Sequence, residues 1–232
     1  MSRLPKGRGD TRRYTAAVRG ASAVAIAATV CLAPVAGTAT AADPPVLGGG
    51  SGIVVANQAE CTLTAIGHDR AGRLVGLTAG HCGEPGATVL AEYDPNYGVV
   101  GRFAHSDPVL DYAVIEFDAE RVTPVRQLGD TAITGLGAPA QFPTVVCKKG
   151  RTTGTTCGVA WGDVGATTDT WTQLCVLEGD SGAPVLVGST LVGMVNAYLG
   201  VGCFGPEVGT DIHAVVADLD ARGEVGAGFQ PI

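Results

Sequence analysis

Short hydrophobic runs, separated by glycine, proline and polar residues, make up most of the chain after residue 50. Several of them follow the period of two that a half-buried strand produces, as in the segment DYAVIEF at 111–117. The runs that we expect to form strands include 53–55, 63–66, 74–77, 112–115, 144–146 and 191–195. Many short strands with frequent turns predict an all-β protein, either a sandwich or a barrel.

The end of the chain has a different pattern, because its hydrophobic residues lie three or four positions apart between 211 and 219. This spacing predicts a short helix, and Gly223 is a suitable residue for its C-terminal end. The segment DRAG at 69–72 predicts the turn of a β-hairpin.

The first 41 residues do not fit the strand pattern. Six basic residues and one acidic residue lie before residue 20, no charged residue occurs from 20 to 42, and the small-residue run ends in ATA at 39–41. These features predict a secretory signal peptide over 1–41. A membrane-anchoring helix is the alternative, but it needs roughly 20 apolar residues, and Pro34 with the Gly-, Ala- and Thr-rich second half argues against it.

Charge changes the picture once this leader is set aside. We expect residues 42–51 (ADPPVLGGGS) to be a flexible leader and residues 52–232 to form one domain. The chain has 15 basic and 22 acidic residues, of which the first 41 hold six and one, so nine and 21 remain, a formal net charge of −12. Nucleic acids and anionic lipids bind basic surfaces. The charge therefore argues against both partners and is typical of a secreted, extracellular protein that does not bind membranes after signal cleavage.

Six of the seven cysteines lie beyond the predicted signal peptide, which contains Cys31. An even number of cysteines in an exported protein predicts disulfides. Zinc is the rival interpretation, but the sequence has no C-x-x-C pair and only four histidines. Six cysteines allow 15 pairings, so sequence alone leaves the connectivity open. They are Cys61, Cys82, Cys147, Cys157, Cys175 and Cys203.

Three motifs carry the candidate chemistry: TAGHC at 78–82, the strand beginning at Asp111, and GDSG at 179–182. Taken alone, GDSG is ordinary turn material. A serine hydroxyl becomes a nucleophile when a histidine removes its proton and a carboxylate orients that histidine. The chain supplies His, Asp and Ser in an order known for such triads. Asp107 is an alternative acid, but Pro108 follows it and no strand does.

In these motifs the sequence resembles the chymotrypsin-like (trypsin-fold) serine endopeptidases, the secreted bacterial branch in particular. The segment CKKGRTTGTTCG at 147–158 extends the resemblance, which covers roughly residues 50–222. It implies two packed six-stranded antiparallel β-barrels with a short C-terminal helix. The N-terminal barrel would span about 52–122, and the C-terminal barrel with the helix about 135–225.

The resemblance also assigns roles. Ser181 would be the nucleophile, His81 the general base and then acid, and Asp111 the residue that orients it. The backbone N–H groups of Gly179 and Ser181 would form the oxyanion hole.

The resemblance further implies a buried ion pair between Asp180 and Lys148, and disulfides that join Cys61 to Cys82, Cys147 to Cys157, and Cys175 to Cys203.

The substrate pocket follows from the same comparison. Its predicted walls are Val176, Leu177 and Glu178 on one side and Asn196, Ala197 and Tyr198 on the other. An apolar lining without an aspartate at the base predicts cleavage after small or medium apolar residues. Neither a metal nor an organic cofactor is required.

The expected partners are a protein or peptide substrate and a proteinaceous inhibitor, bound by a monomeric enzyme. The alternatives are a non-catalytic binding module on the same scaffold and an esterase. The G-x-S-x-G motif of α/β-hydrolases is absent, which argues against the esterase.

Overall fold

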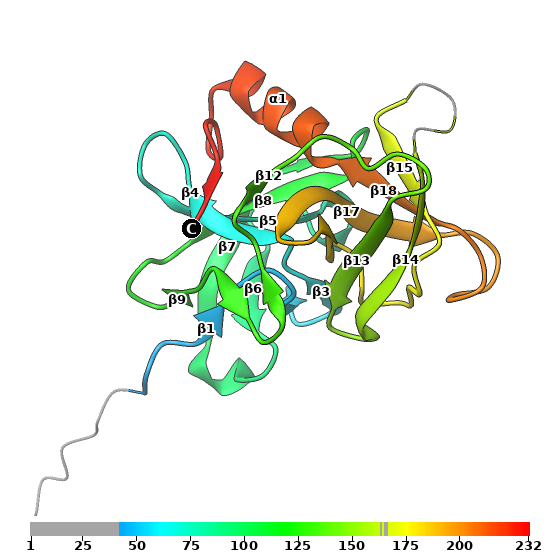
Figure 1. Ribbon diagram of the computed structural model, residues 1–232. Coiled ribbons are helices and arrows are strands. Elements are labelled where there is room, and N and C mark those ends of the chain that lie inside the picture. The colour runs from blue at the N-terminus through cyan, green and yellow to red at the C-terminus, as the bar shows by residue number, and fades with distance from the viewer. Residues whose placement is uncertain (1–41, 163, 165–166) are drawn as a thin grey trace, which may run out of the picture. The chain divides into compact units, whose positions relative to one another are not determined.

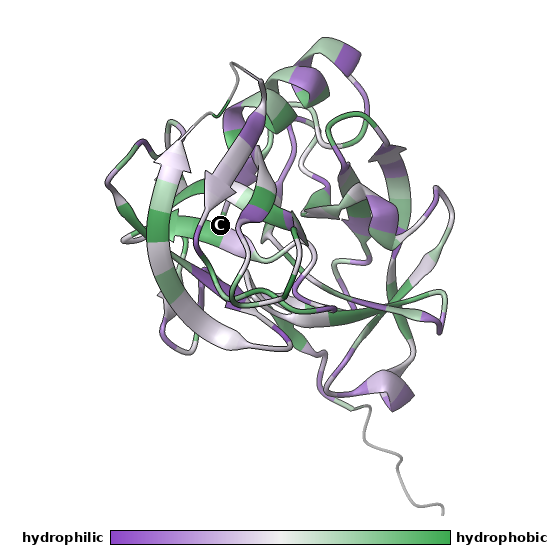
Figure 2. Cartoon of the chain, turned by 90° about the vertical axis from the view of Figure 1, so that its right-hand side faces the viewer, coloured by the Kyte–Doolittle hydropathy of each residue, from purple (hydrophilic) through white to green (hydrophobic). Residues whose placement is uncertain are grey.

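The computed structural model describes residues 42–232 except 163, 165 and 166, so the predicted signal peptide at 1–41 lies outside the described residues. The described chain is built of short strands and a single α-helix, as Figure 1 shows. Strands bury alternate or consecutive hydrophobic side chains, and Figure 2 shows the resulting hydrophobic bands along them. The all-β class predicted from the sequence is confirmed.

The N-terminal half forms a sheet in the order β4-β5-β8-β7-β6-β2-β3, antiparallel throughout. Its strands are β2 (Gly52–Val55), β3 (Ala59–Thr62), β4 (Ala65–His68), β5 (Leu74–Ala79), β6 (Thr88–Ala91), β7 (Val99–Asp107) and β8 (Tyr112–Phe117). Its concave core contains Ile53, Leu63, Phe103 and Ile115, each at most 2% exposed. The order continues from β4 to β19 (Gln230–Pro231), and among the described residues no pairing joins this end of the sheet to β3 at the other end, so the sheet is a half-barrel.

The C-terminal half does close. The order is β17-β16-β13-β14-β15-β18, and an additional pairing of β17 with β18 completes a six-stranded ring. Its strands are β13 (Val145–Gly150), β14 (Gly154–Gly162), β15 (Asp169–Thr172), β16 (Pro184–Val187), β17 (Thr190–Tyr198) and β18 (Glu207–Asp211). Val146, Leu174, Val185 and Val195 lie in its core. The prediction of two β-barrels with a C-terminal helix is confirmed as an architecture, with one ring closed.

Helix α1 (Ile212–Arg222) follows β18 directly. The Asp211 side chain caps its first turn by accepting a hydrogen bond from the His213 N–H, and Gly223 ends it at φ 67°. Ile212 and Leu219 are buried in a cluster that contains Leu77 from the N-terminal sheet. Full burial of each such side chain is worth about 1.5–3 kcal/mol. The helix predicted over 211–219 is confirmed, and it covers the junction of the two halves.

The prediction of a flexible leader at 42–51 is wrong for its second half. Strand β1 (Val46–Leu47) pairs with β9 (Thr123–Pro124), and Leu47 is 0% exposed. Gly48 and Ser51 close a turn through a 2.9 Å hydrogen bond from the Gly48 N–H to the Ser51 hydroxyl. The sequence around Leu47 shows neither the strand nor the helix period, so only its pairing with β9 and its burial show that it belongs to the core.

Shorter elements complete the fold. They are η1 (Gly80–Cys82), η2 (Pro95–Tyr97), β10 (Gln127–Leu128), β11 (Thr131–Ala132), β12 (Gly135–Leu136) and β19 (Gln230–Pro231). Strand β19 pairs with β4, so the C-terminus lies at the edge of the N-terminal sheet. Among the described residues, no helix has the length and apolar character needed to cross a membrane.

Candidate active site

Three strand ends bring the predicted triad together. His81 lies in η1 directly after β5, Asp111 precedes β8, and Ser181 precedes β16. His81 Nε2 is 2.8 Å from Ser181 Oγ, and His81 Nδ1 is 2.8 Å from Asp111 Oδ2. The structure therefore joins a carboxylate, an imidazole and a hydroxyl in one hydrogen-bonded row.

Asp111 holds the histidine at two points. Its Oδ1 accepts the backbone N–H of His81 at 2.8 Å, in addition to the contacts with Nδ1. Burial acts to raise the pKa of Asp111, but the hydrogen bonds and charge of His81, together with a hydrogen bond from the Asn196 amide, outweigh it and the pKa lies below its ordinary value. The same hydrogen bond raises the pKa of His81, with burial opposing it. A charged acid beside a histidine that readily accepts a proton is the arrangement that a general base needs.

The nucleophile sits in a turn that only glycine can build. Gly179 has φ 93° and Gly182 has φ 84°, a region that side chains rarely adopt. A Cβ on Gly182 would lie 2.3 Å from the Thr62 carbonyl oxygen. Thr62 also fastens the turn, because its N–H donates to the Ser181 carbonyl at 2.8 Å and its hydroxyl to the Gly179 carbonyl at 2.9 Å.

The peptide that precedes the nucleophile turn has a defined orientation. The hydroxyl of Thr152 donates to the Glu178 carbonyl at 2.7 Å. Because the carbonyl and the next N–H of a trans peptide point in opposite directions, the Gly179 N–H points away from Thr152. Within the described part of the chain, neither the Gly179 nor the Ser181 amide donates to a backbone acceptor. Both donors thus remain available for a ligand.

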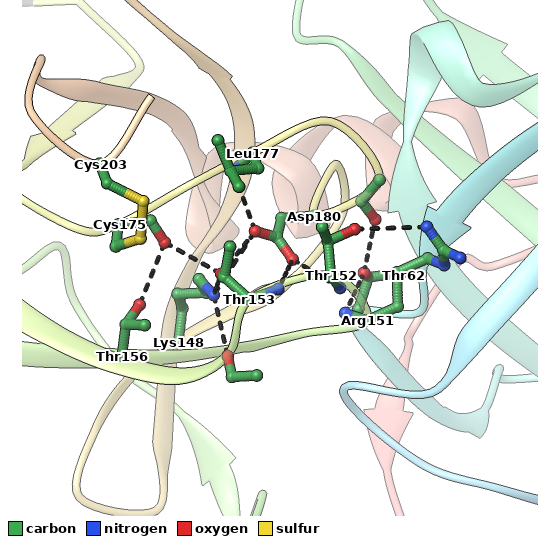
Figure 3. Close-up of polar contacts among 12 residues, drawn as sticks. Thr62, Lys148, Arg151, Thr152, Thr153, Thr156, Cys175, Leu177, Asp180 and Cys203 are labelled. Atoms are coloured by element: carbon green, nitrogen blue, oxygen red, sulfur yellow. Dashed lines mark hydrogen bonds and ion pairs between the residues drawn. A yellow bond between two sulfur atoms is a disulfide. The ribbon is translucent and has the colours of Figure 1, made fainter. Parts of the chain in front are cut away.

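Asp180 is the buried support of this turn (Figure 3). Its carboxylate accepts N–H groups of Thr152 at 3.0 Å, Thr153 at 3.1 Å and Leu177 at 3.0 Å, as well as the Thr153 hydroxyl at 2.6 Å. Lys148 Nζ lies 3.6 Å from Asp180 Oδ2, and both side chains are 0% exposed. The predicted pair of Asp180 and Lys148 is therefore in contact, with the Thr153 hydroxyl between them as a shared partner.

Comparison with known proteins adds evidence of a different kind. No family model matches the sequence, and no curated protein matches it. Solved structures do match. Cellulomonas bogoriensis chymotrypsin is 27% identical with a TM-score of 0.62, and the match covers 81% of this chain and 98% of that one. The chain has the trypsin fold of the serine proteases.

Two other structures with the trypsin fold align as well. Thermobifida fusca protease A has a TM-score of 0.66 at 23% identity, over 81% of this chain and 98% of its own. Nocardiopsis protease has a TM-score of 0.65 at 22% identity, over 75% and 96%. At these identities the likeness shows the fold, and the resemblance inferred from the motifs is confirmed at that level.

The side chain of Asn196 makes a contact with the predicted triad that the sequence analysis did not anticipate. Asn196 was expected in the pocket wall, but its amide donates to Asp111 at both Oδ2 (2.8 Å) and the backbone carbonyl (2.6 Å). The Thr210 hydroxyl lies 3.0 Å from Asn196 Oδ1 and 2.6 Å from the Leu110 carbonyl oxygen, so its one proton can be donated to either acceptor. Asp111 has φ 49°, an uncommon value for a residue other than glycine. The pair of Asn196 and Thr210 therefore braces a backbone position that sterics alone disfavour.

The remaining predicted pocket residues divide into two groups. Val176 is 2% exposed and packs in the core of the C-terminal ring, so its side chain does not form an open wall. Leu177 and Tyr198 are 40% and 37% exposed, and Glu178 and Ala197 are also exposed. Among the predicted pocket residues, the exposed apolar side chains are thus those of Leu177, Ala197 and Tyr198.

The structure pairs the six cysteines as the resemblance implied, Cys61 with Cys82, Cys147 with Cys157, and Cys175 with Cys203. The first bridge ties β3 to η1, which carries His81. The second joins directly opposite positions of β13 and β14. The third ties the segment before the nucleophile turn to the loop after β17. Each restricts the unfolded chain, and a loop of about 15 residues corresponds to about 3 kcal/mol in the chain-entropy account.

In the described part of the chain, three side chains of the kinds that bind metal ions come together at one place outside the triad. His105, Asp107 and Asp218 bring one ligand atom each to within 4.8 Å of one another. Asp107 also has a structural task, because its Oδ1 accepts the N–H groups of Val109 and Leu110 in the turn that leads to Asp111. This explains an aspartate at 107 without assigning it to the triad.

Proposed function

We propose that the protein is a secreted serine endopeptidase that hydrolyses peptide bonds through an acyl-enzyme. The Oγ of Ser181 attacks the carbonyl carbon of the scissile bond, and His81 Nε2 takes the hydroxyl proton. His81 then gives this proton to the departing amine as the C–N bond breaks. A water molecule, deprotonated by the same imidazole, hydrolyses the resulting ester and frees Ser181. Asp111 keeps the imidazole in the required tautomer and stabilises its protonated form.

The negative charge of the tetrahedral intermediate would be bound by the N–H groups of Gly179 and Ser181. The orientation of the Gly179 peptide and the absence of a backbone acceptor for either amide support this role. Donors that are already in place cost no reorganisation when the charge develops. Loss of one such donor typically reduces kcat about 10²–10³-fold.

One observation carries the proposal, the hydrogen-bonded row from Asp111 through His81 to Ser181. Its two links, Nδ1–Oδ2 and Nε2–Oγ, are both 2.8 Å long. This distance lies within the range for direct proton transfer. The fold supports the same reaction class, because the 27% identical structure is a chymotrypsin.

Cleavage after small or medium apolar residues is the proposed specificity. Leu177, Ala197 and Tyr198 offer the apolar surface near Ser181, and a Cβ on Gly202 would lie 2.5 Å from Leu177 and 3.6 Å from Tyr198. Leu177 and Tyr198 therefore flank the same glycine and lie on one side of the proposed pocket. Export is supported by the leader sequence and by three disulfides, which form in oxidising compartments.

The decisive experiment compares the wild type with Ser181→Ala. We expect the wild type to cleave casein and apolar chromogenic peptides and to be labelled at Ser181 by a fluorophosphonate, and the variant to do neither. Equal hydrolysis by both proteins would contradict the proposal. A folded wild type that neither reacts with the probe nor cleaves peptides would favour a non-catalytic binding module.

A further inference from the structure

A cavity of about 440 Å³ adjoins the nucleophile. It is lined by His81, Ser181, the Cys61–Cys82 bridge and the charged side chains of Glu60, Arg151 and Glu178. Leu177, Ala197 and Tyr198, proposed to bind the acyl half of the substrate, do not line it, whereas Glu178, predicted from sequence to lie in the same pocket wall, does. A peptide cleaved at Ser181 extends in two directions from the scissile bond. The cavity is thus available to the half that leaves as the amine.

Among the residues that line the cavity, Arg151 is the one lysine or arginine, and its guanidinium is already paired with carboxylates. Arg151 Nη2 lies 2.9 Å from Glu60 Oε2 and also pairs with Glu92. The Arg151 side chain is only 17% exposed, whereas that of Glu60 is 55% exposed. Hydrogen bonding to Glu92, with burial opposing it, raises the pKa of Arg151, so the guanidinium stays charged and bound to its two acids. It is therefore poorly placed to attract an anionic substrate group.

The exposed charge of the cavity is negative. Glu178 is exposed and has no ion-pair partner among the described residues. Two carboxylates, those of Glu60 and Glu178, line the cavity together with the one guanidinium of Arg151, so the formal charge of the lining beside the scissile bond is −1. A cationic side chain can approach Glu178 and the half-exposed carboxylate of Glu60 without displacing Arg151. An anionic one would be repelled by both.

We propose that this cavity binds a lysine or arginine side chain at the first or second position after the scissile bond. This inference rests on the proposed endopeptidase function and deepens it. Exposed pairs of opposite charge are individually weak, so we expect two of them to favour lysine over an uncharged side chain of equal length about three- to tenfold in kcat/KM. Because the site is open to water, raising the salt concentration to 1 M should remove most of this preference.

The test uses internally quenched peptides that share one acyl half and differ only after the scissile bond. Lysine, norleucine and glutamate are placed in turn at each of the two positions, and kcat/KM is measured for each peptide at low and high salt. Norleucine has the shape of lysine without its charge. We expect lysine to be cleaved fastest, glutamate slowest, and the three rates to converge in 1 M salt.

Variants locate the effect. Glu178→Gln should reduce the lysine-to-norleucine ratio about two- to threefold, and Glu178→Lys should make glutamate the preferred residue. Glu120→Gln is the matched control, because Glu120 is an exposed carboxylate in the turn after β8 and does not line the cavity. It should leave every ratio unchanged. Ratios within one enzyme are informative even where a variant lowers the overall rate.

The outcomes separate the two proposals. Cleavage of all three peptides at equal rates, or ratios that do not respond to Glu178→Lys, would overturn the cation-binding cavity and leave the endopeptidase function standing. If the wild type cleaved none of the peptides, whichever residues their acyl half contained, the result would instead count against the endopeptidase function itself.

Discussion

The buried carboxyl group of Glu207 should control how the stability of the folded chain depends on pH. Glu207 is 0% exposed, and its Oε2 accepts the Thr172 hydroxyl at 2.5 Å, while its Oε1 has no partner among the described residues. The nearby cation Lys148 is paired with Asp180. One cation thus faces two acids in the interior of the C-terminal ring. The least costly arrangement is an ion pair with Asp180 and a neutral Glu207.

The size of the effect follows from the proton that Glu207 retains. Burial raises the pKa of Glu207 from 4.5 to about 8, although the Thr172 hydrogen bond and the charge of Lys148 oppose the shift. Between these values the folded chain holds a proton that the unfolded chain has released. Stability contributed by this group is therefore complete below pH 4.5 and is lost as pH rises towards 8. At about 1.4 kcal/mol per pH unit, the loss is about 5 kcal/mol over the whole interval and about 3 kcal/mol by pH 7.

Glu207→Gln removes the titration and keeps the size of the side chain. We expect the two proteins to have similar unfolding free energies at pH 4.5 and the variant to become the more stable one as pH rises. Urea unfolding at several pH values, with both proteins in a Ser181→Ala background to prevent self-digestion, measures the difference. Glu120→Gln, at an exposed site, should change stability by no more than about 0.5 kcal/mol at any pH. Parallel pH curves for wild type and Glu207→Gln would refute the reasoning.

Three further predictions concern the triad and its support. Because hydrogen bonding to Asp111 raises the pKa of His81, kcat/KM should rise with pH around a midpoint above 6.5, and a rate that is flat from about pH 5 to 8 would contradict a histidine base. Asn196→Ala removes the bond to the charged oxygen of Asp111, so kcat should fall about 10- to 100-fold with little change in KM in steady-state assays, and an unchanged kcat would show that the brace is dispensable. Lys148→Met leaves the Asp180 carboxylate buried without its cation and should lower the free energy of unfolding by about 3–5 kcal/mol in urea titrations, whereas a change below about 1 kcal/mol would mean that the hydrogen bonds to Asp180 suffice.

Much of the triad could be predicted from sequence because each member is the residue at the end of a recognisable strand. His81 follows the run at 74–79, Asp111 precedes the one at 112–117, and Ser181 precedes the one at 184–187. Strand ends that meet at one place present their side chains there. Pairing of the cysteines could not be derived from spacing, and it followed from the resemblance alone.

The parts that sequence missed are contacts made by side chains across long separations. The amide of Asn196 was expected in the pocket wall, but it points to Asp111, 85 residues earlier in the chain. Thr62 touches a turn that lies 117 residues later, and no local pattern marks it. Leu47 was predicted to be in a flexible segment, because the glycines that follow it are typical of linkers. These contacts arise only when the folding of the two sheets brings residues that are far apart in the sequence close together.

Catalysis and packing of the two halves depend on the same few contacts around the nucleophile. Glycine makes the turn at 179–182 sterically possible, but its conformational freedom also makes the folded turn costly in entropy. The turn is therefore fixed from both sides. Asp180 ties it to Thr152, Thr153 and Leu177 within the C-terminal half, and Thr62 ties it to the N-terminal half. Since a buried ion pair contributes little net stability, the pair of Asp180 and Lys148 is better explained by position than by stability, because it places the ammonium group beside the carboxylate on which four donors converge. His81 and Asp111 both belong to the N-terminal half. A movement of one half against the other would therefore displace the amides of Gly179 and Ser181 relative to His81, while the pair of His81 and Asp111 moved as a unit.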